Sequence, residues 1–131
     1  MKLVIAEEGS DLAADLWATS HPAISSVLCY PEGRAALAAA RRGARLTPAS
    51  YGKALEDFES LQDELSLIGL DEKLAREAGR LAERFALRGY DAVHLAGALS
   101  AGGITTLVSW DGDLRRAAHG AGCAVAPPTS P

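Results

Sequence analysis

Residues 104–114 read Ile-Thr-Thr-Leu-Val-Ser-Trp-Asp-Gly-Asp-Leu. The first half of this stretch, 104–109, is β-branched and apolar, which predicts a strand. Asp111 comes two residues after the end of this strand, and the residues after it, 112–114, have the pattern of a helix start. A buried strand that leads directly into a helix is the repeating unit of an α/β domain.

The rest of the chain shows the same alternation. Further strands are expected at 22–24, 65–68 and 123–125. The helices are expected to begin at Ser10-Asp11, Ser25-Ser26, Thr47-Pro48, Asp71, Asp91 and Asp111. Gly43 is expected to end the second helix and Gly89 the fourth, and Pro31 to kink the second. Strands alternating with helices predict an α/β fold with a mainly parallel central sheet flanked by helices.

Composition limits the class of protein. With 131 residues, 48% of them hydrophobic and 23% charged, the chain suits one globular domain, expected over 1–126 with a tail at 127–131. The net charge of −4 excludes a protein that coats nucleic acid by bulk charge, but not an enzyme with a local site. Cys29 and Cys123 lack metal-ligand spacing and suit a reducing compartment. No stretch is apolar enough for a secretory signal or a membrane span, so we expect a cytoplasmic protein.

Three acids lie just after an expected strand or at the start of an expected helix. Glu32 lies in the first turns of the second expected helix, Asp91 begins the helix 91–102, and Asp111 follows the strand 104–109. Ligands of parallel sheets bind at the carboxyl ends of the strands, where these acids are expected to converge. Mg²⁺ prefers such hard oxygen ligands. Asp91 and Asp111 are equally well explained as helix N-caps, and Glu32 as a solvated acid.

Several motifs then carry a family resemblance. Residues 90–96, YDAVHLA, resemble the "YDAxHLA" signature of PIN-domain ribonucleases, and residues 107–114 are similar to that family's strand and "TxDxxL" motif, with Ser109 in place of Thr. Residues 25–32 resemble the "SSxxxxE" entry to the helix with the second acid. Residues 2–10 resemble the stretch directly after the family's first catalytic Asp. The resemblance implies a PIN-like α/β domain.

The resemblance also implies a function, that of the toxin in a VapC-type toxin–antitoxin pair. Such proteins are Mg²⁺- or Mn²⁺-dependent endoribonucleases that form homodimers and are inhibited by a small antitoxin. It implies that the metal is held by Glu32, Asp91, Asp111 and, more weakly, Asp113. Ser109 would orient Asp111 or a water by a hydrogen bond, and Arg115 and Arg116 would contact RNA phosphates.

One part of the family pattern is not in the chain. The first strand and its "DTSAL" stretch would precede Met1, so we expect an upstream start codon and weak cleavage by residues 1–131 alone. The alternative is a catalytically impaired PIN-fold module that keeps its dimer and antitoxin contacts. A haloacid-dehalogenase-like or receiver-like domain is disfavoured, because it needs a late Lys and no Lys follows Lys73.

Overall fold

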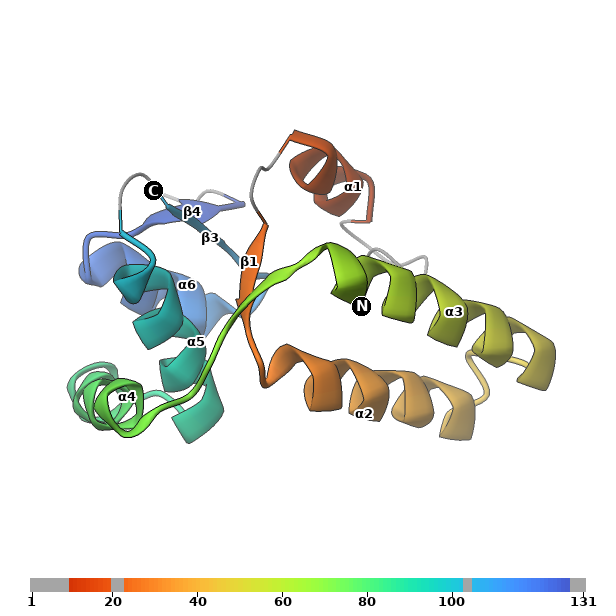
Figure 1. Cartoon of the computed structure of the whole chain (residues 1–131), viewed down its shortest axis with the longest axis horizontal. Coiled ribbons are helices and arrows are strands. Elements are labelled where there is room, and N and C mark those ends of the chain that lie inside the picture. The colour runs from red at the N-terminus through yellow and green to blue at the C-terminus, as the bar shows by residue number, and fades with distance from the viewer. Residues whose placement is uncertain (1–9, 20–22, 103–104, 128–131) are drawn as a thin grey trace. The chain divides into compact units, whose positions relative to one another are not determined.

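The computed structural model describes residues 10–19, 23–102 and 105–127, and short strands are interspersed among the helices (Figure 1). The helices are α1 (Ser10–Thr19), α2 (Cys29–Arg42), α3 (Pro48–Glu64), α4 (Glu72–Phe85), α5 (Gly89–Ser100) and α6 (Gly112–Gly120). The strands are β1 (Ile24–Ser26), β2 (Ser66–Ile68), β3 (Thr106–Val108) and β4 (Ala124–Ala126). The predicted α/β class is confirmed.

The described strands pair two by two. β1 pairs with β2, and β3 pairs with β4. The β3–β4 pair is parallel, with Leu107 opposite Val125, and α6 is the crossover between its strands. Figure 1 shows these two strands side by side next to α6. The predicted strand at 104–109 and the helix after it therefore belong to a β–α–β unit.

The chain divides into two compact units, the first made of Met1–Ile24 and Leu28–Ser66 and the second of Ser25–Val27 and Leu67–Pro131. The expected single domain over 1–126 stays a prediction. Of its expected tail, 128–131 lies outside the described residues, as do Pro22 and Ile104 of two expected strands and most of the motif at 2–10. No helix in the described part of the chain is long and apolar enough to cross a membrane. A cytoplasmic location stays a prediction.

The first unit has its core between α2 and α3. Leu37, Ala54 and Phe58 are buried together. Half-buried side chains complete this cluster: Leu46, Tyr51 and Leu55. Thr47 caps α3 as predicted, because its hydroxyl accepts from the Ser50 N–H at 3.1 Å while the Ser50 hydroxyl accepts from the Thr47 N–H at 2.8 Å.

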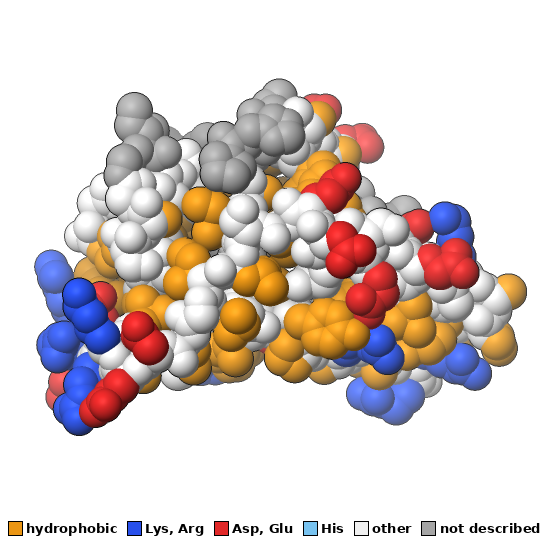
Figure 2. Space-filling view, viewed as in Figure 1, with side chains coloured by type: hydrophobic (Ala, Val, Ile, Leu, Met, Phe, Trp, Pro, Cys, Tyr) orange, Lys and Arg blue, Asp and Glu red, His pale blue; other side chains and the backbone are white. Residues whose placement is uncertain are grey.

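The second unit is built around α5. Half of the residues of this helix are buried, and Leu95 is completely so. α4 packs against it with Leu74 and Ala78 buried, while its outer face carries charges of both signs. Figure 2 shows these Lys, Arg, Asp and Glu side chains intermixed over α4. The buried face and the charged face of α4 follow from its sequence, in which apolar residues recur at helical spacing.

Three features of the helices differ from the expectations: the start of α2, the effect of Pro31, and the boundary between α4 and α5. Ser25 and Ser26 belong to β1, and the N-cap of α2 is Leu28, which makes no side-chain capping bond. Pro31 does not interrupt α2 because it lies in the first turn, where backbone N–H groups have no partner within the helix. Gly89 begins α5; α4 ends at Phe85, with Ala86 in the left-handed conformation as its C-cap.

Candidate functional site

Asp91 is the buried acid of the second unit. It is the third residue of α5, and its side chain is only 11% exposed. It is not the N-cap of that helix, a position that Arg88 occupies with extended backbone. A carboxylate in the first turn is favoured by the helix dipole, yet its burial requires a charged or hydrogen-bonding partner. Arg88 supplies that partner: its Nε donates to Oδ2 of Asp91 at 3.1 Å.

Asp111 is the N-cap of α6, as the sequence allowed. Its Oδ1 accepts from the Leu114 N–H at 2.9 Å, which fixes one carboxylate oxygen at the helix start. The other oxygen, Oδ2, lies 3.7 Å from Nη2 of Arg88. The capping role and a binding role are therefore compatible, because they use different oxygens.

Ser109 positions Asp111 through the backbone. Its Oγ accepts from the Asp111 N–H at 3.1 Å, closing a turn between the end of β3 and the start of α6. This contact is to the main chain of Asp111 and not to its carboxylate. Ser109 therefore orients the residue as a whole.

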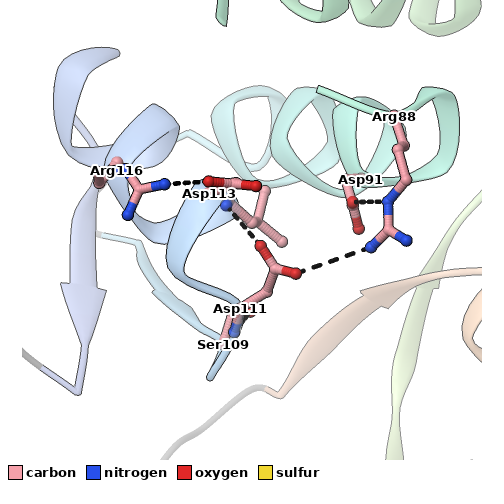
Figure 3. Close-up of polar contacts among 7 residues, drawn as sticks. Arg88, Asp91, Ser109, Asp111, Asp113 and Arg116 are labelled. Atoms are coloured by element: carbon pink, nitrogen blue, oxygen red, sulfur yellow. Dashed lines mark hydrogen bonds and ion pairs between the residues drawn. The ribbon is translucent and has the colours of Figure 1, made fainter. Parts of the chain in front are cut away.

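Arg88 connects the two acids, and sequence reasoning missed it. Figure 3 shows its guanidinium between the Asp91 and Asp111 carboxylates, which come from the starts of two different helices. The hydrogen bond to Asp91, together with electrostatic interactions with Tyr90, Asp91 and Asp111, raises the pKa of Arg88. Its guanidinium also lies over the Tyr90 ring, 5.3 Å from the centroid. The sequence signal that could have identified Arg88 is its position three residues before Asp91, about one helical turn away.

Asp113 and the neighbouring arginines are arranged differently. Asp113 forms an ion pair with Arg116 on the surface of α6, and both side chains are at least 70% exposed (Figure 3). The pair lines a shallow pocket with Phe85, Ala86 and Ala117. Arg115 is half-buried, with its Nε enclosed by the protein. Arg116 is thus the more accessible of the two arginines predicted to contact RNA.

The remaining predicted ligand, Glu32, lies in the first turn of α2, in the other unit, and is half-buried. Its approach to Asp91 and Asp111 stays a prediction. Among the described residues, no group of three or more His, Cys, Asp or Glu side chains is gathered as a metal site.

The two acids that do share a partner can still be tested for their fit to a divalent ion. Asp91 and Asp111 each direct Oδ2 toward the same positive charge. Mg²⁺ is commonly held by only one or two carboxylates, with water and substrate phosphate oxygens as its other ligands. The donor set of this pair therefore fits Mg²⁺ or Mn²⁺.

A family model and two similar proteins agree on the family of this chain. The PIN domain family model matches residues 2–120. The chain is 46% identical over 128 residues to Ribonuclease VapC45 of Mycobacterium tuberculosis (strain CDC 1551), an alignment that covers 97% of this chain and 89% of that protein. Ribonuclease VapC49 of M. tuberculosis (strain H37Rv) matches with the same identity and coverage. The chain therefore belongs to the PIN-domain family.

Proposed function

We propose that this protein is a Mg²⁺- or Mn²⁺-dependent endoribonuclease and the toxin of a toxin–antitoxin pair. The observation that carries the proposal is the shared contact of Asp91 and Asp111 with one cationic group. Membership of the PIN family and the ribonuclease names of two relatives support the reaction class. Two carboxylates that can share one cation form a donor set able to hold a divalent ion for phosphodiester hydrolysis.

In this proposal the carboxylates of Asp91 and Asp111 hold the ion, with Glu32 and Asp113 as further ligands. A bound divalent ion neutralises charge on the scissile phosphate and promotes ionisation of the attacking water. Asp91 provides a buried carboxylate ligand whose position is set by α5. Asp111 provides an oxygen held by the α6 cap and by the turn at Ser109.

Substrate binding is assigned to the arginines of α6. The exposed Arg116 side chain can exchange Asp113 for a phosphate oxygen of RNA, since an exposed ion pair contributes little stability. Arg115, whose Nε is enclosed, has less freedom to do so. In this proposal Arg116 supplies a local positive charge for the RNA backbone in addition to the acidic site. A protein with a net negative charge needs such a local contact to act on nucleic acid.

Regulation is assigned to a partner. The contact of two carboxylates with Arg88 shows that this position accepts a guanidinium, so an antitoxin Arg or Lys placed there would occupy the proposed metal position. We also expect a homodimer. Co-expression with the adjacent small open reading frame, followed by pull-down, tests the partner; a complex that survives Asp91→Asn unchanged would argue against docking at this acid.

Cleavage of labelled single-stranded RNA tests the activity. Residues 1–131 are assayed with MgCl₂, MnCl₂ or EDTA. We expect metal-dependent cleavage and its loss in Asp91→Asn. Asp71→Asn is the matched control, because Asp71 caps α4 and lies outside the site. Cleavage that EDTA leaves unchanged, or the absence of cleavage with either metal, would refute the proposal.

A further inference from the structure

Arg88 faces the oxygens that the proposed ion needs. Oδ1 of Asp111 is engaged by the Leu114 N–H, so Oδ2 is the oxygen that the helix cap leaves for a cation, and it faces Arg88. On Asp91, Oδ2 accepts directly from Arg88. An ion bound by both carboxylates would therefore displace the guanidinium from at least one of them.

The contacts of Arg88 are of a kind that can be exchanged. Its side chain is 67% exposed, in contrast to the 11% of Asp91, so most of the side chain already faces water. Its separation of 3.7 Å from Asp111 is an ion pair without a hydrogen bond. Arg88 also sits at the N-cap of α5, ahead of the helix proper, where the side chain can turn without disturbing the buried face.

A displaced guanidinium would remain next to the reaction. Its backbone is fixed beside Asp91 at the start of α5, and the ring of Tyr90 lies 5.3 Å away. A guanidinium binds phosphate oxygens with two parallel hydrogen bonds, and it keeps its charge at any pH at which the protein is folded. The nearest source of such oxygens in the proposed reaction is the RNA backbone.

We propose that Arg88 competes with the divalent ion for Asp91 and Asp111 and, once displaced, binds a phosphate of the RNA substrate. The inference rests on the proposed function. Arg88 keeps the two carboxylates paired until the ion arrives, which limits their repulsion. It then becomes a substrate-binding residue, so the ion and the RNA bind as a coupled pair.

The test is a pair of titrations on the purified chain of residues 1–131. Mn²⁺ affinity is measured by isothermal titration calorimetry for the parent, Arg88→Gln, Arg88→Lys and Arg84→Gln. Arg84 is the matched control, since its guanidinium lies over the Phe85 ring at 4.9 Å and not beside the acids. We expect Arg88→Gln to bind Mn²⁺ about two- to fivefold more tightly, as expected for loss of a competing ion pair with an exposed partner. Arg88→Lys and Arg84→Gln should stay near the parent.

RNA affinity should change in the opposite direction. With CaCl₂ in place of Mn²⁺, fluorescence anisotropy of a short labelled RNA should show severalfold weaker binding to Arg88→Gln and no change for Arg84→Gln. Opposite signs separate this role from a structural one, because a damaged site would bind both the ion and RNA more weakly. Unchanged RNA affinity would overturn the substrate-binding half of the inference.

The outcomes also separate the inference from the proposed function. Equal or weaker Mn²⁺ binding by Arg88→Gln, with EDTA-sensitive cleavage intact, overturns only the role of Arg88. Mn²⁺ binding by neither protein overturns both. Should Arg88→Gln fail to fold, NMR of the Arg88 Nε–H in the parent decides: its resonance should shift and exchange faster with water when MgCl₂ is added, and an unchanged signal would overturn the inference.

Discussion

Asp71 and Asp111 cap their helices in the same way but differ in their second carboxylate oxygen. Oδ1 of Asp71 accepts from the Leu74 N–H at 2.8 Å, and Oδ1 of Asp111 accepts from the Leu114 N–H at 2.9 Å. Oδ2 of Asp111 additionally faces Arg88 at 3.7 Å. The chain thus contains a structural cap and a cap that also belongs to the candidate site, which allows stability and function to be separated.

Substitutions at these two caps should give different results. Asp111→Asn keeps an acceptor for the Leu114 N–H, so the free energy of unfolding should stay within about 0.5 kcal/mol of the parent while cleavage is lost. Asp111→Ala and Asp71→Ala should each lower the free energy of unfolding by about 0.5–2 kcal/mol. Of these two, only Asp111→Ala should lose RNA cleavage. Urea denaturation and the cleavage assay measure both effects, and an active Asp111→Asn would contradict the assignment.

Binding of the ion should stabilise the folded protein. Because the ligand set exists only in the native state, MgCl₂ at a hundredfold excess over its Kd should raise the free energy of unfolding by about 2.7 kcal/mol. Differential scanning fluorimetry should show a rise in Tm for the parent and for Asp71→Asn, and a smaller one for Asp91→Asn. An equal shift in all three proteins would indicate that Mg²⁺ binds elsewhere.

Two glycines of the first unit make a test of its packing. A Cβ on Gly33 would lie 2.3 Å from the ring of Phe58, whereas one on Gly52 would meet nothing within 4 Å. Gly33→Ala should therefore destabilise the protein by about 1–3 kcal/mol through overpacking. Gly52→Ala lies in an exposed part of α3 and should stabilise it by up to about 1 kcal/mol. Urea denaturation measures both, and a stable Gly33→Ala would contradict the packing of α2 against α3.

Local signals in the sequence predicted much of the fold. Asp71, Asp111 and the pair Thr47-Pro48 mark helix starts because their capping bonds form within a few residues. The strand 104–109 was recognised from its β-branched run and is shorter in the structure, at Thr106–Val108. The prediction that Gly89 ends the fourth helix is wrong, because a glycine suits both the end of one helix and the loop that leads into the next. Here Ala86 takes the left-handed C-cap position instead.

The candidate site was predictable only in part. Asp91 and Asp111 were singled out because each lies near the start of a helix, and the structure brings both to Arg88. The role of Arg88 depends on a contact between residues far apart in the chain, and helical periodicity shows only its relation to Asp91. Ser109 is predicted to orient Asp111 or a water by a hydrogen bond; its Oγ accepts from the backbone N–H of Asp111, a geometry set by the turn.

Arg116 should contribute to RNA binding in a way that a matched arginine does not. Arg116 and Arg76 both form exposed ion pairs within one helix, Arg116 with Asp113 in α6 and Arg76 with Glu72 in α4. Arg116→Gln should weaken RNA binding and reduce the slope of log affinity against log salt by about 1, the signature of one lost phosphate contact. Arg76→Gln should change neither. Equal effects would point to the overall charge of the protein.

The central claim, that Asp91 and Asp111 hold one divalent ion for RNA cleavage, is tested most directly by a double-mutant cycle. The quantity measured is kcat/KM for a labelled RNA in MnCl₂, compared among the parent, Asp91→Asn, Asp111→Asn and the double variant. If both acids hold the same ion, each single variant should lose at least ~10²-fold, and the double variant should lose little more. A double variant whose loss equals the product of two independent losses, or a single variant that cleaves at the parent rate, would contradict the claim.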